Sequence, residues 1–283
     1  SFIKHFNKKN VIGVEPCLDV AKITKRKNYI IYDKYWTKKL ARKILKNHQK
    51  IDVIYSANTI SHIKNLNEVF KSINILLNAK GILIIEDPSL LECLKKNTYD
   101  QFYNEHIYVF SLIGLQNILN KHGLEVFKVE KTETHGGSNR YYIKKNKANI
   151  KVEKSVLKQK NKEIKYGLAN YKTYLQFYQR VKTSKEKLIS IFKKCKTNNK
   201  KIIGYGATAK SSTILNYCKI DNSFLDYFLD TTHAKQNKFT PGTKIPIKKY
   251  HGSIEKNVDY VFLGAWNFKK EIFQKEKRFI KNG

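Results

Sequence analysis

Hydrophobic and polar positions in the first half of the chain follow two alternating periods. Short apolar runs predict buried strands, at residues 11–16, 29–36, 51–58 and 81–88. Apolar residues three and four positions apart predict amphipathic helices, at residues 37–49, 66–81 (closed by Gly81) and 111–123. Two more strands are predicted around the turn THGG, at residues 124–133 and 138–146. Strands that alternate with helices indicate a parallel α/β sheet, here with an antiparallel pair at its edge.

The second half repeats this α/β pattern after a long basic segment. Residues 151–199 are rich in lysine and predict helix, and we interpret residues 149–199 as a helical bridge. A strand, a glycine-bearing turn and a helix are then predicted in KIIGYGATAKSST, followed by strands at residues 224–232 and 259–266. The chain is therefore predicted to hold an α/β domain at 1–148 and a smaller Rossmann-like domain at 200–283.

Polar residues follow several of the predicted strands. Glu15, Asn58 and the pair Glu86–Asp87 stand where strands of the first domain end. Ligands of parallel α/β sheets bind at the carboxyl ends of the strands, and an acidic residue there commonly holds ribose hydroxyls. We expect a ligand site at this edge.

Composition narrows the class of protein. The net charge is +33, but only five of the 56 basic residues are arginine, so the charge is mostly lysine spread along the chain. A protein that binds nucleic acid specifically would more often cluster arginine with aromatic residues on one surface. No apolar run is long enough to cross a bilayer, no signal peptide is evident, and the four cysteines show no paired spacing. We expect a cytoplasmic protein without membrane insertion or a specific nucleic-acid partner.

One segment, QFYNEHIYVFS at residues 101–111, carries candidate chemistry. Glu105 and His106 stand beside each other among four aromatic residues. A hydrophobic surrounding would keep the imidazole of His106 neutral and basic. If the segment is helical, Tyr103 shares a face with His106. The alternative is an interior pair of polar residues with no catalytic role.

Three motifs together resemble one family over nearly the whole chain. They are YNEHIYVFS (103–111), THGGSNRYYI (134–143), and GYGATAKSSTILNYC (204–218) with the following DTTHAKQNKFTPGTKIPI. In this order they resemble the S-adenosylmethionine-dependent C-methyltransferases that act on nucleotide-linked deoxysugars. The resemblance implies a class I methyltransferase sheet, truncated at its N-terminus, and a methyl transfer to the carbon beside a 4-keto group.

The resemblance also implies roles for particular residues. The catalytic set would be Tyr103, Glu105, His106 and His62, with His106 preferred over His62 as the base. The cofactor S-adenosylmethionine would contact Glu15, Ala57 and Asn58. The nucleotide sugar would contact His135, Gly136, Arg140 and Lys210, with Arg140 as a fork for phosphate oxygens. An ordinary hairpin turn at THGG and a solvated Lys210 are the alternatives.

The family carries a zinc-binding module and a glycine-containing cofactor loop upstream of the part that this chain matches. We expect zinc only in that module, no metal in residues 1–283, and an inactive fragment. Two other functions stay open: an O- or N-methyltransferase on another small molecule, and a basic nucleic-acid-binding protein with a methyltransferase-like fold.

Overall fold

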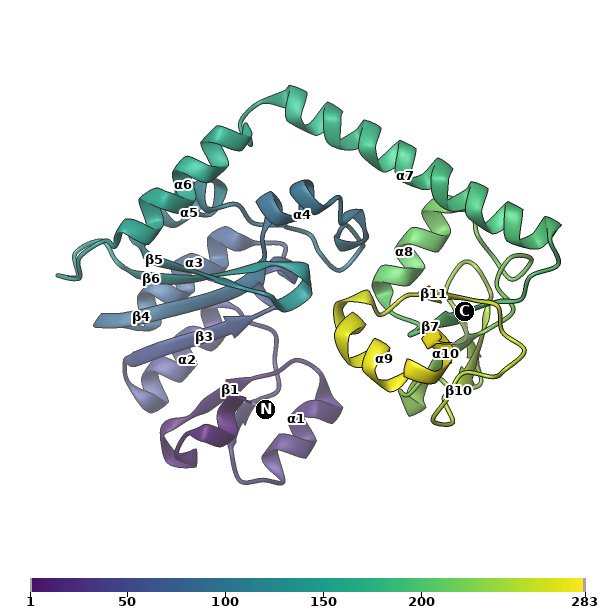
Figure 1. The fold of residues 1–283 in the computed structure, drawn as a ribbon. Helices are drawn as coiled ribbons and strands as arrows, with labels where there is room; N and C mark the ends of the chain where they lie inside the picture. Colours follow the sequence, from purple (N-terminus) through teal and green to yellow (C-terminus); the bar gives the residue numbers. More distant parts are fainter. Residues whose placement is uncertain (1, 282–283) are drawn as a thin grey trace. The chain divides into compact units, whose positions relative to one another are not determined.

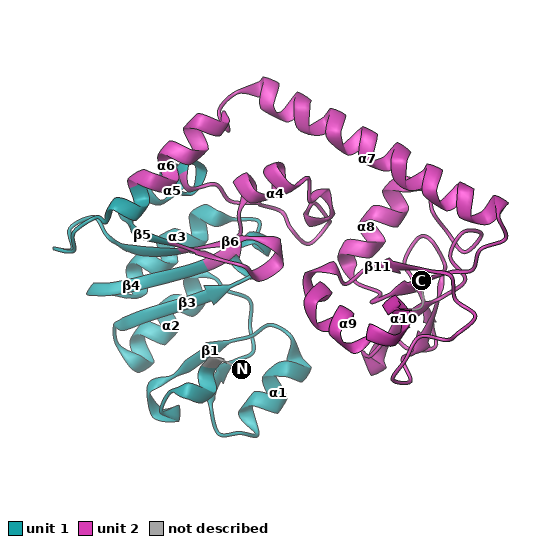
Figure 2. Ribbon diagram, in the orientation of Figure 1, with its two compact units in different colours: residues 1–85, 113–129, 141–156 teal, residues 86–112, 130–140, 157–283 magenta. Residues whose placement is uncertain are grey.

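The computed structural model describes residues 2–281, which fall into two compact units. Unit 1 comprises residues 1–85, 113–129 and 141–156, and unit 2 comprises residues 86–112, 130–140 and 157–283 (Figure 2). The sequence placed boundaries near residues 148 and 199. Segments 86–112 and 130–140 instead group with the C-terminal half, because their side chains bond to it, as Asp100 does to Trp266.

Unit 1 begins with two short parallel strands. β1 (Ile12–Val14) pairs with β2 (Ile30–Tyr32), and α1 (Leu18–Lys25) makes the crossover that a parallel pair requires (Figure 1). β2 is shorter than the predicted strand at 29–36, and α1 was not predicted. The next helix, α2 (Lys38–His48), confirms the prediction for residues 37–49. Its N-cap is Thr37, whose hydroxyl accepts the N–H of Leu40 at 3.1 Å.

The larger sheet of unit 1 has the strand order β3-β4-β6-β5. Its strands are β3 (Ile51–Ala57), β4 (Leu77–Pro88), β5 (Leu124–Thr132) and β6 (Ser138–Lys145). α3 (Leu66–Leu76) connects β3 to β4, and α5 (Leu112–Asn120) precedes β5. Residues 133–137 are too few to cross over between parallel neighbours, so β5 and β6 form the antiparallel edge pair that the sequence predicted.

The predicted end of the helix at 66–81 is wrong. α3 ends at Leu76, and β4 begins at the next residue. Gly81 therefore lies inside a strand instead of capping a helix. A Cβ at Gly81 would lie 2.9 Å from the carbonyl oxygen of Ile51, so the close approach of two backbones explains this glycine.

Unit 2 contains a five-stranded sheet with the order β11-β7-β8-β10-β9. The strands are β7 (Ile202–Tyr205), β8 (Phe228–Asp230), β9 (Lys238–Phe239), β10 (Pro246–Lys249) and β11 (Tyr260–Leu263). β11, β7, β8 and β10 run parallel to one another, and β9 runs antiparallel to β10. α8 (Ala209–Cys218) follows β7, so the predicted second α/β unit is confirmed, although β9 and β10 were not foreseen.

The basic segment predicted as a bridge forms two helices. α6 (Lys154–Tyr166) and α7 (Tyr171–Thr197) are separated at Gly167, which has φ +85° (Figure 1). The remaining helices are α4 (Leu90–Lys96), α9 (Lys269–Lys275) and α10 (Lys277–Lys281). Short 3-10 helices are η1 (Phe2–His5), η2 (Lys8–Asn10), η3 (Ile60–His62), η4 (Tyr99–Gln101), η5 (Thr134–Gly136), η6 (His233–Lys235) and η7 (Trp266–Phe268).

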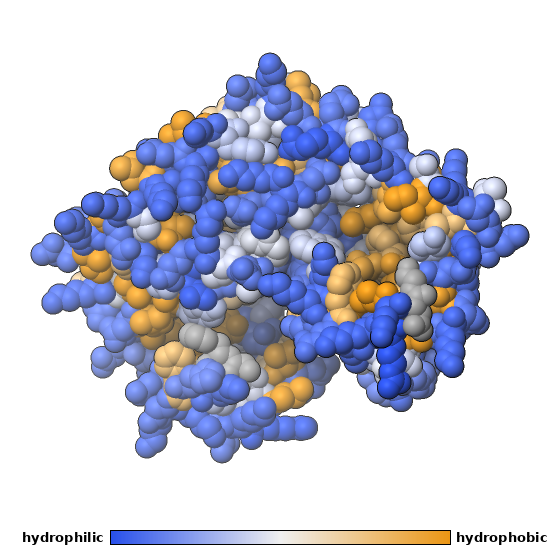
Figure 3. Space-filling model, viewed as in Figure 1, coloured by the Kyte–Doolittle hydropathy of each residue, from blue (hydrophilic) through white to orange (hydrophobic). Residues whose placement is uncertain are grey.

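Hydrophilic side chains are distributed over the surface of both units. Figure 3 shows them across most of the face in view, interrupted by smaller apolar areas. This distribution agrees with a charge carried by dispersed lysines, and no helix among residues 2–281 is long and apolar enough to span a membrane.

Candidate active site

His106 lies in a turn of unit 2 that brings its ring onto the ring of Tyr103. The N–H of His106 donates to the carbonyl oxygen of Tyr103 at 2.9 Å, and residues 103–106 form a turn instead of a helix. The ring centroids lie 4.2 Å apart, and Tyr103 Oη lies 3.0 Å from His106 Nε2. The expected meeting of these side chains therefore occurs through a tight turn.

The second ring nitrogen of His106 defines the tautomer. Nδ1 lies 2.8 Å from the carbonyl oxygen of Gln101, which accepts but cannot donate. Nδ1 therefore carries the hydrogen, and in the neutral ring Nε2 accepts the hydroxyl hydrogen of Tyr103. Burial raises the pKa of Tyr103, so its phenol remains a donor at neutral pH. A basic nitrogen is thus held against a proton-carrying oxygen.

Glu105 does not share the hydrophobic pocket that we expected. Its side chain is exposed, and Phe102 and Ile107 are each 41% exposed. The two tight turns at His106 and Ile107 leave these side chains on the outside, while Tyr103 and His106 are half-buried. The structure therefore places Glu105 on the surface next to the half-buried His106.

Gln101 links the His106 turn to the THGG loop. Its buried side chain donates from Nε2 to the carbonyl oxygen of His135 at 2.6 Å. His135 has φ +53° and Gly136 has φ +86°, and a Cβ at Gly136 would overlap the ring of Trp266. Burial lowers the pKa of His135, with Lys210 adding to the shift. Gly136 is thus required by the approach of an indole ring, and the loop is more than a plain hairpin turn.

Arg140 is paired with carboxylates. Its Nε and Nη2 lie 2.8 and 2.7 Å from Oε2 of Glu86, which is only 5% exposed, and Nη1 lies 3.7 Å from Glu130. Thr134 donates to the other Glu86 oxygen at 3.0 Å. The guanidinium edge that we expected to receive phosphate therefore already binds a buried anion.

Asp100 and Lys210 are buried beside the partly exposed ring of Trp266. Trp266 Nε1 donates to Asp100 Oδ2 at 2.6 Å, and Lys210 Nζ lies 5.2 Å from the centroid of a Trp266 ring. Asp100 and Lys210 are 2% and 9% exposed. Burial raises the pKa of Asp100 and lowers that of Lys210, and each charge partly offsets the other's shift. Lys210 is therefore not the solvated lysine that was the alternative.

The raised pKa of Asp100 predicts a pH dependence of stability. The folded protein holds this proton at pH values where the unfolded chain, with an ordinary aspartate pKa of about 3.9, has lost it. The free energy of unfolding should therefore fall as pH rises above about 4. Asp100→Asn keeps an oxygen acceptor for Trp266 and removes this decline. Urea unfolding over a pH series measures the difference.

Asp221 supplies a control of opposite sign. Hydrogen bonds from Ser223 lower the pKa of this exposed carboxyl, so its contribution is present above the ordinary pKa and disappears as pH falls. The free energy of unfolding of Asp221→Asn should therefore lie below that of the parent protein at neutral pH, and this difference should shrink as pH falls. If the free energy of unfolding of Asp100→Asn changes with pH as it does in the parent protein, the pH dependence does not come from Asp100.

The turn GYGATA uses its backbone donors internally. The N–H of Ala207 donates to Asp230 Oδ2 at 2.9 Å, and the N–H of Thr208 donates to Ser211 Oγ at 2.9 Å. Thr208 and Ser211 form a capping box at the start of α8, where Ser211 N–H donates back to Thr208 Oγ1 at 3.1 Å. The backbone of this turn therefore offers few free N–H groups to a phosphate.

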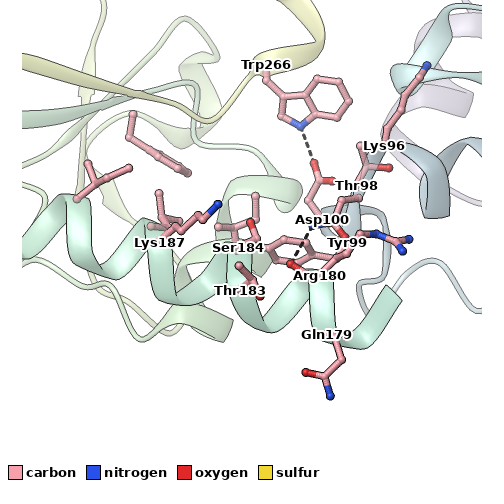
Figure 4. Close-up of a pocket in the computed structure, with 15 residues that line it drawn as sticks. Lys96, Thr98, Tyr99, Asp100, Gln179, Arg180, Thr183, Ser184, Lys187 and Trp266 are labelled. Carbon is pink, nitrogen blue, oxygen red and sulfur yellow. Dashed lines mark hydrogen bonds between the residues drawn. The ribbon is translucent and has the colours of Figure 1, made fainter. Parts of the chain in front are cut away.

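A cavity of about 940 Å³ lies beside Asp100 and Trp266 in unit 2. η4 and α7 supply much of its wall, and Figure 4 shows Asp100 bonded to Trp266 at its border. The lining includes aromatic rings and cationic groups: Tyr99, Phe262, Trp266, Lys96, Arg180 and Lys187. Burial raises the pKa of Tyr99 to about 12, so this ring stays uncharged.

Unit 1 has its own cavity, of about 640 Å³, between β1 and β3. Ala57 and His62 line it, and Val14 and Pro16, on either side of Glu15, do so as well. Glu15 Oε1 accepts the N–H of Cys17 at 2.8 Å, which directs the carboxylate toward the end of β1. His62 therefore belongs to the cavity of unit 1, whereas His106 belongs to unit 2.

Asn58 stands between Ala57 and Thr59, which line this cavity, and it provides a test of a cofactor there. It follows β3 with φ +49°, and its Oδ1 is buried and accepts no hydrogen bond from residues 2–281. An orphaned buried acceptor is costly unless a donor reaches it from a ligand. Asn58 and the carboxylate of Glu15 offer acceptors for hydroxyl and amino groups, so the residues present fit a nucleoside-bearing cofactor.

Two protein-family models match consecutive parts of the chain. Residues 133–283 match the family described as C-methyltransferase C-terminal domain, and residues 1–129 match the family described as methyltransferase domain. The chain belongs to the C-methyltransferase family. A curated relative, C-methyltransferase NovU of Streptomyces niveus, is 30% identical over 273 residues, which cover 96% of this chain. The chain spans 65% of the length of that relative.

Solved structures similar to this C-methyltransferase chain include other methyltransferases. A possible histamine N-methyltransferase of Thermotoga maritima is 21% identical, with a TM-score of 0.37, and covers 48% of this chain and 72% of its own. A methyltransferase of Clostridium acetobutylicum is 16% identical, with a TM-score of 0.36, and covers 48% and 74%. These similarities are too low to inform on substrate or mechanism.

Several site residues of this C-methyltransferase chain were not predicted. Asp100 and Trp266 stand 166 positions apart, and no pattern in the sequence joins them. Gln101 lies inside the motif-bearing segment but was not singled out. The pairing of Glu86 with Arg140 was also missed, although both residues had been noted. Within residues 2–281, no three His, Cys, Asp or Glu side chains gather as metal ligands.

Proposed function

We propose that the complete protein uses S-adenosylmethionine to methylate a carbon of a 4-keto deoxysugar carried on a nucleoside diphosphate. The single observation that carries the proposal is the contact of His106 Nε2 with Tyr103 Oη at 3.0 Å, with Nδ1 fixed on a carbonyl oxygen. Transfer to carbon, unlike transfer to an amine, requires removal of a carbon-bound proton. A base that is oriented and paired with a phenol suits that requirement.

The reaction begins with proton abstraction beside the ketone. Nε2 of His106 takes the proton, the C–H electron pair moves to the ketone oxygen, and an enolate forms. The Tyr103 hydroxyl then donates to that oxygen, or relays the proton of Nε2. General-base catalysis and oxyanion stabilisation contribute about 10²–10⁴-fold each. The enolate carbon is thereby left as the nucleophile for a methyl group that the bound cofactor would supply.

The cofactor supplies the electrophilic methyl group when it is bound. Glu15 would hold hydroxyls of its ribose, and Asn58 would accept from a donor of the same molecule through the orphaned Oδ1. Ala57 and His62 would line its cavity. These assignments leave His106 and Tyr103 to do the proton chemistry.

Methyl transfer from labelled cofactor to a panel of 4-keto nucleotide sugars tests the proposal with the full-length protein. We expect label on a carbon adjacent to the ketone. Label on oxygen or nitrogen would favour an O- or N-methyltransferase. A protein that transfers no label, yet binds nucleic acid with a steep salt dependence, would favour the third function.

A further inference from the structure

The outer side of α6 and α7 carries apolar and aromatic side chains that face solvent. The inner side of these helices already packs with α4 in an apolar cluster, formed by Leu91, Leu94, Leu168, Tyr166, Tyr174 and Phe177. Five further side chains are exposed: Leu157 (61%), Ile164 (56%), Tyr171 (74%), Leu175 (47%) and Tyr178 (56%). A surface helix needs one apolar stripe for packing, and exposed apolar residues that gather on one surface mark an interaction site.

The five exposed side chains follow helical spacing. Leu157 and Ile164 are seven residues apart, close to two helical turns, so they lie on one side of α6. Tyr171, Leu175 and Tyr178 are four and three residues apart, which places them on one side of α7. Figure 3 shows apolar areas along the border where α6 and the start of α7 lie in Figure 1. Each helix therefore presents an apolar stripe to solvent.

The turn between the helices holds the two stripes in a fixed relation. Thr173 Oγ1 donates to the carbonyl oxygen of Gly167 at 2.8 Å. Tyr174 Oη donates to the carbonyl oxygen of Leu168, also at 2.8 Å. The two stripes thus form one surface, which we call the α6–α7 face and which consists of Leu157, Ile164, Tyr171, Leu175 and Tyr178.

Lysines border the α6–α7 face, and little negative charge compensates them. Residues 154–178 contain six lysines, about twice the mean density of net positive charge in the chain, and their one acidic residue, Glu163, is fully buried. Five of the lysines are exposed: Lys154, Lys158, Lys160, Lys165 and Lys172. Partial burial lowers the pKa of the sixth, Lys162, and the charges of Lys131 and Lys158 add to the shift. The surroundings of this face are therefore strongly cationic.

The lysines of α6 stand on both sides of its apolar stripe. At about 3.6 residues per turn, Lys160 falls on one side of the line from Leu157 to Ile164, and Lys158 and Lys165 fall on the other. Their long side chains can reach past the apolar groups to a charged surface. The α6 part of the face thus has an apolar centre between two cationic borders.

An anionic lipid surface is the partner that suits this arrangement. Side chains on the outside of a helix stand out from it and do not line a groove, whereas a partner peptide commonly binds in a groove. A second copy of the chain would bring the same lysines together, and like charges repel. Leucine, isoleucine and tyrosine between lysines suit a helix that lies in a membrane interface, where apolar groups enter the acyl boundary and phenols and ammonium groups stay at the headgroups.

We propose that the α6–α7 face binds the surface of a membrane that contains anionic phospholipids. The helices lie along the headgroups, with the five side chains of the face directed into the acyl boundary and the bordering lysines against lipid phosphates. The proposal is independent of the proposed function, because no residue of the face lines either of the two cavities described above.

Co-sedimentation of the full-length protein with vesicles tests the apolar part of the proposal. We expect binding to phosphatidylcholine vesicles that contain phosphatidylglycerol. The double variant Ile164→Gln with Leu175→Gln should bind them about 10–100-fold more weakly, because two apolar side chains no longer leave water. Ile23→Gln is the matched control, since Ile23 of α1 is also 56% exposed, and it should bind like the parent. Equal binding by the double variant and the parent would overturn the proposal.

A triple lysine variant tests the cationic border. Replacing Lys158, Lys160 and Lys165 by glutamine should weaken binding to the anionic vesicles about 100-fold and flatten its salt dependence, because lysines near the surface attract anionic headgroups. The same replacement of Lys39, Lys43 and Lys46, which are exposed on α2, removes an equal charge and should weaken binding by less than about threefold. Equal losses in the two triple variants would show that only net charge matters and that the face is not the site.

Tryptophan fluorescence gives a readout of the contact itself. Tyr171→Trp should show an emission shift to shorter wavelength, as a difference from the parent spectrum, when phosphatidylglycerol-containing vesicles are added. Tyr35→Trp is the control, because Tyr35 and Tyr171 are 78% and 74% exposed, and it should show no shift.

Two other occupants of the face would be recognised by the same variants. If Tyr171→Trp emits at short wavelength before vesicles are added, other residues of the full-length protein cover the face. If the parent forms a dimer that the double variant Ile164→Gln with Leu175→Gln dissociates, a second copy covers it. Either result, or a parent protein that does not bind phosphatidylglycerol-containing vesicles, would overturn the proposal.

Discussion

Replacement of His106 by alanine in the complete protein should abolish exchange of the carbon-bound hydrogen beside the ketone. The Nδ1–H group of His106 donates to the carbonyl oxygen of Gln101, so Nε2 is the nitrogen that can accept a proton. The hydroxyl oxygen of Tyr103 lies 3.0 Å from Nε2. Loss of a general base lowers the rate by about 10²–10⁴-fold. The measurement is deuterium uptake from heavy water into the 4-keto nucleotide sugar without cofactor, followed by proton NMR.

Two variants make this result specific. Tyr103→Phe keeps the ring stacked on His106 and removes the hydroxyl, so it should slow exchange less than His106→Ala does. His62→Ala alters a residue of the unit 1 cavity and should leave exchange intact, although methyl transfer can fall if the cofactor site changes. Exchange that survives in His106→Ala and disappears in His62→Ala would assign the base to His62 instead.

Phe228→Ala should destabilise unit 2 more than any other change considered for that unit. Phe228 is fully buried in β8, and its ring meets Phe262 edge-on with centroids 6.3 Å apart. A Cβ at Gly204 would overlap the same ring, so the sheet is built around this side chain. Removing a buried phenylalanine ring costs about 3–5 kcal/mol through lost burial and the cavity left behind.

Urea unfolding followed by the fluorescence of Trp266, in a Trp36→Phe background, reports on unit 2 specifically, since the chain has two tryptophans. Phe239→Ala is the matched control. This ring is 65% exposed in β9, so its loss should change stability by less than about 0.5 kcal/mol. Equal losses in the two variants would show that Phe228 is not part of the unit 2 core.

The elements with strong local signals were predictable from sequence. α2 has a threonine cap, regular apolar spacing and a polar opposite face, and its observed bounds differ from the predicted ones by one residue at each end. The end of α3 was not predictable in this way. Leu76 and Leu77 are both buried, so the apolar pattern runs on while the backbone changes from helix to strand. β9 has only two residues, too few for any periodicity.

The contacts of the site also differ in whether local sequence predicts them. Tyr103 and His106 are three positions apart, so their contact follows from local geometry, whether the backbone forms a helix or a turn. Trp266 reaches Asp100 only through the fold of unit 2. The pairing of Glu86 with Arg140 likewise depends on the fold. The sequence shows that Arg140 is cationic, but only the fold shows that its guanidinium is already bound to a carboxylate.

The cavity between β1 and β3 has a consequence for the handling of this chain. Each of these strands pairs on one side only, with β2 and with β4, among residues 2–281. The facing edges therefore present amide and carbonyl groups beside apolar side chains such as Val53, which is 54% exposed. An unpaired strand edge of this kind can form backbone hydrogen bonds with an extended peptide from any source. Concentrated preparations of these 283 residues should consequently self-associate unless that border is covered.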